Sequence, residues 1–139
     1  MTLSMEITAR ADLARRGVIR TARGEIQTPC FMPVGTRGAV RTLSSADLAD
    51  LGVEIVLGNT YHLMLKPGAD VVGRLGGLHG FADWSGHVLT DSGGYQIFSL
   101  EPGGNVALDD GGVTFRSTYD GGTHRLTLAR FAGEFRSME

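Results

Sequence analysis

The sequence predicts an α/β fold in which short parallel strands alternate with helices. Near-continuous apolar runs occur at residues 30–34, 53–57 and 87–90, as in parallel strands that are covered on both faces. Helix signals separate these runs. Each run ends in a polar cluster, and α/β folds, most consistently (β/α)8 barrels, build their sites at that edge of the sheet.

Composition indicates a globular protein of one domain. The chain has 139 residues, of which 42% are hydrophobic and 20% charged, so it is not a disordered chain. Its formal net charge of -2 does not indicate a nucleic-acid binder, although net charge does not report how charges are distributed. Cys30 is the only cysteine, so no internal disulfide forms and a cysteine-based metal site needs other ligand types.

Targeting signals are not evident. Residues 1–10 lack the basic-then-apolar pattern of a signal peptide, and no apolar run approaches the length of a membrane span. A cytoplasmic protein without membrane contact is therefore expected.

The N-terminal region predicts a hairpin over residues 15–28, whereas residues 1–14 carry little signal. Short strands at 18–21 and 25–28 flank residues 22–24, where Gly24 can supply a positive φ. Four arginines gather here, and they indicate either a phosphate contact or simply a solvated hairpin face. These are Arg15, Arg16, Arg20 and Arg23.

A short helix is predicted between the first two apolar runs. Ser44 is its N-cap, Asp47 suits the positive end of the helix dipole, and Gly52 ends it. A helical turn is expected over residues 63–66 and a second helix over 69–75.

The remaining elements are less regular. A loop is predicted over residues 78–86, with Trp84 either a packing anchor or a binding residue. Residues 101–125 predict an antiparallel hairpin insertion, with strands at 106–108 and 113–116 and a further turn at 119–123. The stretch 126–139 is weakly helical.

The stretch of residues 86–100 contains the main group of candidate site residues. Its strand ends in a carboxylate, a hydroxyl, two glycines, an aromatic ring and an amide, in the order Asp91, Ser92, Gly93, Gly94, Tyr95 and Gln96. Paired glycines let a ligand approach the backbone, the carboxylate can exchange a proton, and the ring can cover a flat base. The same residues are ordinary turn composition, so a purely structural turn is the alternative.

Three ordered motifs resemble the N-terminal part of bacterial tRNA-guanine transglycosylases. They are TPCFMPVGT at residues 28–36, LGNTYHL at 57–63 and LTDSGGYQIFSL at 89–100. The similarity runs from about residue 14 to residue 127. It implies a modified (β/α)8 barrel, here incomplete, with an N-terminal antiparallel hairpin and a later antiparallel hairpin insertion.

The resemblance also implies a reaction. The family exchanges guanine at the tRNA wobble position for a 7-deazaguanine (preQ1 or queuine), through an aspartate nucleophile, on the way to queuosine. It implies that Asp91 is the proton acceptor, that Ser92, Gly93 and Gly94 line the base pocket, and that Tyr95 covers the purine. The implied partners are the tRNA anticodon loop, the 7-deazaguanine base and, in the complete protein, a second copy in a homodimer.

The chain also departs from the family. A (β/α)8 barrel needs about 250 residues, and the nucleophile and the structural zinc ligands of the family lie in a part that this sequence does not contain. No metal ligands are therefore assigned to this chain. The expectation is a truncated or frame-shifted member, with residues 1–139 the N-terminal portion of one catalytic domain. Its predicted parts are residues 1–28, 29–100, 101–125 and 126–139, the last diverging from the family.

Three functional hypotheses remain at this point. The first is an enzyme fragment that is inactive alone. The second is a non-catalytic module that binds purine or a partner subunit. The third is an inactive remnant that folds poorly.

Overall fold

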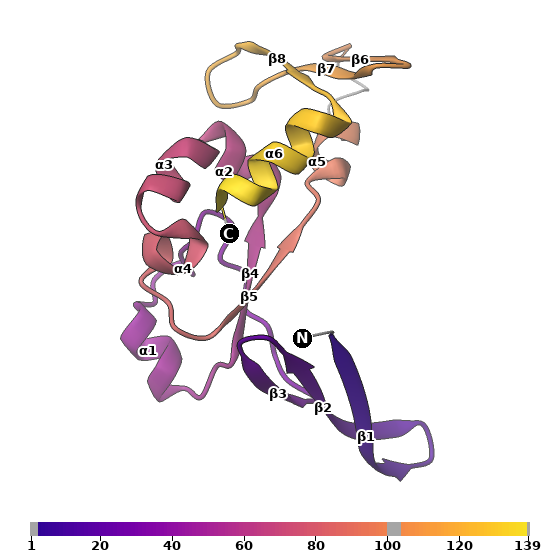
Figure 1. The fold of residues 1–139 in the computed structure, drawn as a ribbon, viewed down its shortest axis with the longest axis vertical. Helices are drawn as coiled ribbons and strands as arrows, with labels where there is room; N and C mark the ends of the chain where they lie inside the picture. The colour runs from indigo at the N-terminus through magenta and orange to yellow at the C-terminus, as the bar shows by residue number, and fades with distance from the viewer. Residues whose placement is uncertain (1–2, 100–103, 139) are drawn as a thin grey trace.

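The structure is a computed structural model that describes residues 3–99 and 104–138. It is a mixed α/β arrangement with three sheets. A parallel pair lies in the middle, and Figure 1 shows its arrows pointing away from the N-terminal sheet. They point toward the helices and the sheet formed by later parts of the chain.

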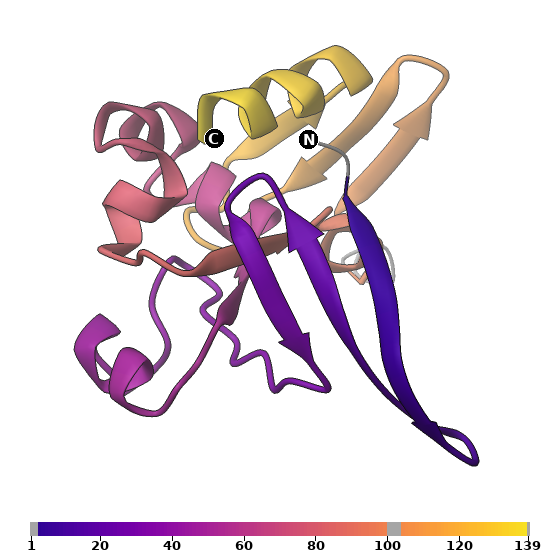
Figure 2. The ribbon, with the colours of Figure 1, turned by 60° about the horizontal axis from the view of Figure 1, so that its bottom comes forward.

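The N-terminal sheet has the order β1 (Ser4–Ala11), β2 (Ala14–Thr21) and β3 (Gly24–Thr28), all antiparallel. The predicted hairpin over residues 15–28 is confirmed as β2 and β3. Strand β1 was not predicted, because its side chains are almost all exposed and give no apolar alternation. Figure 2 shows the three strands as a separate layer in the foreground.

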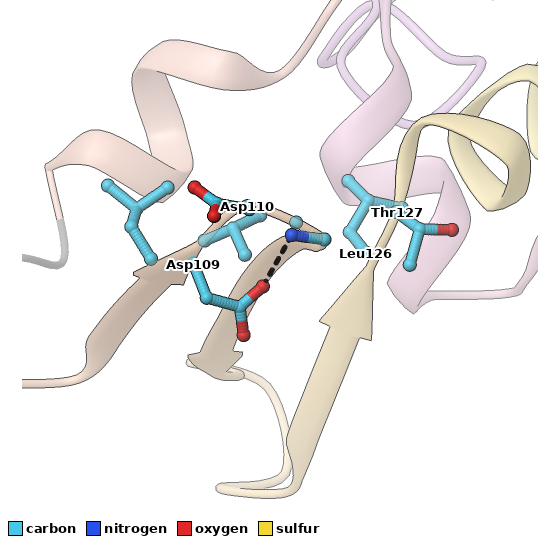
Figure 3. A pocket seen from close by; sticks show the side chains of 8 residues that line it. Asp109, Asp110, Leu126 and Thr127 are labelled. Carbon is cyan, nitrogen blue, oxygen red and sulfur yellow. Dashed lines mark hydrogen bonds between the residues drawn. The ribbon is translucent and has the colours of Figure 1, made fainter.

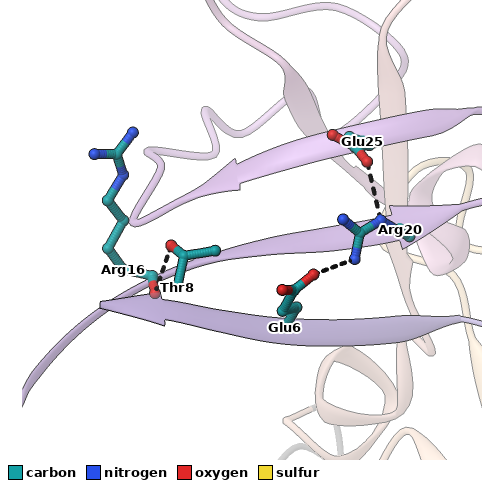
Figure 4. A network of polar contacts seen from close by, with 5 residues as sticks. All are labelled: Glu6, Thr8, Arg16, Arg20 and Glu25. Atoms are coloured by element: carbon teal, nitrogen blue, oxygen red, sulfur yellow. Dashed lines mark hydrogen bonds and ion pairs between the residues drawn. The ribbon is translucent and has the colours of Figure 1, made fainter. Parts of the chain in front are cut away.

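One arginine of the predicted cluster is held by carboxylates. Arg20 lies 2.6 Å from Glu6 through Nη1 and 2.9 Å from Glu25 through Nε, so it ties the three strands together (Figure 4). These side chains are about half exposed, and pairs of this kind contribute little to stability. For Arg20, the solvated-face interpretation is the one the structure supports.

The central pair consists of β4 (Ile55–Asn59) and β5 (His87–Asp91), which are parallel as predicted. The prediction that the apolar run at residues 30–34 forms a regular strand was wrong. Val34 forms only an isolated parallel bridge to Leu57, flanked by bonds from Leu57 N to Pro33 O (3.0 Å) and from Gly35 N to Leu57 O (2.7 Å). Pro33 has no N–H to extend the ladder, so pairing stops there.

Six helices are described in residues 3–99 and 104–138. They are α1 (Ser45–Asp50), α2 (Thr60–Leu65), α3 (Ala69–Arg74), α4 (Gly77–Ala82), α5 (Gly94–Phe98) and α6 (Leu128–Met138). The predicted start of α1 is confirmed, because Ser44 and Asp47 form a reciprocal capping box. The helical turn expected at 63–66 is instead a helix that begins three residues earlier, directly after β4.

The loop predicted over residues 78–86 was wrong in its first half, which is α4. Gly76 takes a left-handed conformation (φ 88) and ends α3, and α4 begins at the next residue. Glycines at 76, 77 and 80 hid the helical period. Leu78 and Phe81 still share a helix face and pack on the core formed by α2, α3 and α6.

A second antiparallel sheet follows the described part of α5. Its strands are β6 (Val106–Asp109), β7 (Gly112–Arg116) and β8 (Thr123–Leu126), in that order. The predicted insertion is thus three-stranded and reaches one residue beyond 125, while its first residues, 101–103, and residue 100 of the motif lie outside the described residues. The helical character expected after residue 126 is confirmed by α6.

Among the described residues, the core is divided into three small clusters. Tyr61, Ile97, Phe115 and Leu126 join α2 and α5 to the β6–β8 sheet. The α2–α3–α6 cluster is formed by Leu63, Ala69, Val72 and Met138. Trp84 packs with Leu48 and Val56, is 7% exposed and donates from Nε1 to His87 O at 3.0 Å, which confirms it as a packing anchor.

Candidate functional site

Asp91 lies at the carboxyl end of β5, directly opposite Asn59 at the end of β4. Asn59 Nδ2 donates to Asp91 Oδ2 at 2.7 Å, and Gly93 N donates to Asp91 Oδ1 at 3.1 Å. Thr60 Oγ1 donates to the backbone oxygen of Asp91 at 2.6 Å. Both carboxylate oxygens and the backbone are therefore held in one orientation at the sheet edge.

Asn59 is the residue that sequence reasoning did not assign to the site. It is buried and caps α2, accepting at Oδ1 from His62 N at 3.2 Å while its amide nitrogen faces Asp91. One side chain thus starts a helix and orients the carboxylate. The available signal was its place at the end of an apolar run, equivalent to that of Asp91.

The two site glycines have different structural reasons. Gly93 has φ 68, and a Cβ there would lie 2.5 Å from Tyr61 Cβ, so the packing of β5 and α5 on α2 requires glycine. Gly94 opens α5 without a positive φ, and a Cβ there would meet only Ser92 Oγ at 3.4 Å, an ordinary contact. The described fold requires Gly93 but leaves room for a side chain at residue 94.

Ser92, Gly94 and Tyr95 lie on the outer side of this turn. Ser92 is exposed and accepts at Oγ from Gly94 N at 3.3 Å. Ser92 and Gly94 border a mainly apolar hollow of about 270 Å³ that continues to Ile97 and Phe98. The Tyr95 side chain is 82% exposed on α5, so its ring is open to a flat partner. The structure thus brings the five predicted residues together in one turn and the start of one helix.

A histidine of α2 that interacts with Asp91 also contacts a tyrosine in the turn between β7 and β8. His62 Nδ1 lies 2.7 Å from Tyr119 Oη, and the two rings meet edge to face with centroids 5.7 Å apart. Burial lowers the pKa of His62, the Asp91 charge raises it, and the Arg37 charge lowers it. Asp91 and Arg37 therefore both lie close enough to His62 to influence its protonation.

A separate hollow of about 350 Å³ lies at the β6–β7 turn (Figure 3). Asp109 accepts there from Gly111 N at 2.8 Å and pairs with Arg125, and the hydrogen bonds from Arg125 lower the pKa of Asp109 to about 2. Both of its oxygens are thereby occupied in closing the hairpin. This carboxylate has a structural role, and the hollow contains none of the predicted site residues.

Two classes of feature are not found in residues 3–99 and 104–138. Among the side chains that the structure describes, no three histidine, cysteine or carboxylate groups come together as metal ligands. None of the helices in the described part is long and apolar enough to cross a membrane.

Comparison with known proteins finds one family. The family described as queuine tRNA-ribosyltransferase matches residues 10–133. A queuine tRNA-ribosyltransferase of Gloeobacter violaceus is 51% identical over 129 residues, which cover 91% of this chain and 34% of that protein. One of Syntrophobacter fumaroxidans is 55% identical over 114 residues, covering 82% of this chain and 30% of that protein. The chain therefore spans about a third of the length of the curated relatives it matches.

Proposed function

Because the chain belongs to the queuine tRNA-ribosyltransferase family, we propose that it is the N-terminal part of a tRNA-guanine transglycosylase. In this proposal residues 29–100 supply the first strand–helix units of a (β/α)8 barrel. Residues 1–28 are its antiparallel extension, 101–125 an insertion and 126–139 a divergent end of the same catalytic domain. The parallel pair with its polar carboxyl edge supports this arrangement.

The observation that carries the proposal is the fixed carboxylate beside an open glycine turn. Asp91 is held by Asn59 and Gly93, Gly94 leaves space that the fold does not need, and Tyr95 offers an exposed ring. Asp91 takes the proton of the exchanged base, Ser92, Gly93 and Gly94 line its pocket, and Tyr95 covers it. The substrates are the tRNA anticodon loop and a 7-deazaguanine, either preQ1 or queuine.

The chemistry divides between this chain and the part of the relatives that it does not span. The family resemblance implies that the nucleophile and the structural zinc ligands lie in that other part. It also implies that the homodimer forms in the complete protein. The residues of this chain act on the base, because an ionised carboxylate accepts a proton and an aromatic face stacks on a purine. A carboxylate that is already held in one orientation loses less conformational entropy when the base binds.

A second candidate is a non-catalytic module that binds purine or a partner subunit. It is favoured by one observation: the groups assigned to the base all lie within a single turn and helix start of this chain. Titration of this chain with guanine, followed by the fluorescence of its aromatic residues, tests that module. Saturable binding supports a purine-binding module, and no binding up to the solubility limit of guanine rules out that form of it.

The proposed role of Asp91 is tested in a complete protein bearing these residues. Asp91→Asn keeps the shape but cannot accept a proton at neutral pH, so base exchange should fall about 10²–10⁴-fold while tRNA binding persists. Asp110→Asn, at the exposed β6–β7 turn, removes the same charge and should leave exchange unchanged. Near-normal exchange by a folded Asp91→Asn variant refutes the assignment and supports the structural turn.

Tyr95 gives a separate readout in the same protein. Tyr95→Ala should weaken base binding with little effect on folding, because its ring is exposed and stacking contributes roughly 1–3 kcal/mol per base. Tyr95→Phe keeps the ring and should be mild. Equal base affinity in all three proteins would remove Tyr95 from the pocket.

A further inference from the structure

A polar and aromatic cluster at the sheet edge has no part in the proposed handling of the base. It consists of Arg37, His62 and Tyr119, which come from three separate segments. Thr36, the residue before Arg37, accepts at its backbone oxygen from Asn59 N at 3.3 Å. This bond places Arg37 beside the end of β4, where the Asn59 side chain donates to Asp91.

Arg37 is the only charged member of the cluster at neutral pH. Arg37 is exposed, and it makes no ion pair with any side chain that the structure describes. By contrast, Arg20 and Arg125 are each paired with carboxylates. Burial and the Arg37 charge lower the pKa of His62, although Asp91 opposes them. The cluster therefore presents one unneutralised guanidinium next to a neutral imidazole.

Tyr119 orients that guanidinium. The Arg37 guanidinium carbon lies 6.0 Å from the centroid of the Tyr119 ring, within the range of a cation–π contact. Tyr119 Oη is in turn fixed by His62 Nδ1 at 2.7 Å. A guanidinium held against one aromatic face keeps its N–H donors free at its edges, and those donors match the geometry of phosphate oxygens.

We propose that Arg37 contacts a backbone phosphate of an RNA substrate, and that Tyr119 and His62 are its positioning residues. The inference rests on the proposed function, since a nucleotide whose base reaches Asp91 brings its flanking phosphates to the same sheet edge. Phosphate contacts fix register without reading sequence. Arg37 thus sets where the backbone lies while the Asp91 turn recognises the base.

The test uses this chain and a fluorescently labelled RNA stem–loop, with binding followed by anisotropy over a range of salt concentrations. Arg37→Ala should lower affinity about tenfold and reduce the slope of log affinity against log salt by about 0.7–0.9, the loss of one phosphate contact. Arg37→Lys keeps the charge and should keep the slope. Arg74→Ala is the matched control, an exposed arginine at the end of α3, and should leave both quantities nearly unchanged.

The positioning role needs a readout that a structural role would not move. Tyr119→Leu should weaken RNA binding in the unaltered chain but have no further effect in the Arg37→Ala background, because both changes disable the same contact. Tyr119→Phe keeps the ring, so its RNA affinity should lie between those of the unaltered chain and Tyr119→Leu. An equal loss in both backgrounds would mean that Tyr119 acts only through folding.

The outcomes separate this inference from the proposed function. RNA affinity and salt slope that do not change in Arg37→Ala, or no RNA binding by the unaltered chain, overturn the inference even if guanine binds. Conversely, RNA binding that depends on Arg37 without any guanine binding upholds the phosphate contact and removes the base pocket.

Discussion

At the scale of single residues, the position of Asp91 is defined by its neighbours. Asn59 and Gly93 each donate to a different carboxylate oxygen, and Thr60 holds the backbone of the same residue. A charge-assisted bond of this kind is stronger than one between neutral groups. Asn59 is therefore as much a part of the arrangement as the carboxylate that it orients.

Two histidines give the chain a predictable pH dependence. Burial lowers the pKa of both His62 and His79, and for His79 the Arg23 charge adds to the effect. Because their folded-state pKa lies below the ordinary 6.5, the unfolded chain binds more protons below that pH. The free energy of unfolding should therefore be constant above about pH 7.5 and decrease as the pH falls below about 6.5.

Chemical denaturation at a series of pH values measures this effect. His79→Gln should reduce the slope of unfolding free energy against pH between pH 6.5 and 5.5. The carboxylates with lowered pKa, Asp47, Asp109 and Asp120, have an ordinary value of 3.8 and lose their contribution only in more acidic solution. A stability that is flat from pH 7.5 to 5.5 contradicts the prediction.

At the scale of elements, the Asp91 turn depends on how α5 packs against α2. A Cβ at residue 93 would collide with the backbone and Cβ of Tyr61, which is itself buried with residues of α5 and the β6–β8 sheet. Gly94, one residue later, has no such neighbour. Packing therefore requires glycine at residue 93, whereas residue 94 of the same motif faces open space.

Alanine at each glycine should separate these reasons. Gly93→Ala places a Cβ against Tyr61 at a positive φ and should destabilise the chain by about 1–3 kcal/mol or more. Gly94→Ala should leave the melting temperature nearly unchanged and weaken guanine binding, because its methyl group enters the space assigned to the base. Thermal melts and guanine titrations of both variants are the measurements. Equal melting losses in the two variants would show that Gly94 is also a packing glycine.

At the scale of the whole molecule, the described part of the chain leaves much apolar surface uncovered. The side chains of Phe31, Val34 and Leu89 are 81%, 57% and 45% exposed. They lie on the parallel β4–β5 pair or beside it, and among the described residues β5 has no partner on its outer edge. Exposed apolar patches and unpaired edges of this kind promote association.

We therefore expect the isolated chain to self-associate. Sedimentation at increasing concentration should show a rising mean mass, and Phe31→Ser together with Leu89→Thr should reduce it. Leu13→Ser is the control, because Leu13 is 97% exposed at the distant β1–β2 turn. A monomer with a sharp, concentration-independent thermal transition would contradict this expectation.

The sequence alone determined those features that depend on short stretches of chain. The Ser44 cap, the hairpins and the two parallel strands each follow from local patterns, and the polar clusters that end the apolar runs predicted a site at one sheet edge. The family was also readable, because long motifs in order are specific. Local propensities and periodicities act within a few residues, so they can be read without a structure.

Only the tertiary structure decided which side chains meet. His62 and Tyr119 are 57 positions apart, and Asn59 and Asp91 are 32 apart. Helix α4 was hidden by glycines, and β1 forms because β2 offers it an edge rather than because of its own pattern. Gly93 and Gly94 look alike in the sequence, and only the approach of Tyr61 distinguishes them. Contacts across such separations depend on how whole elements pack, and no local pattern encodes that packing.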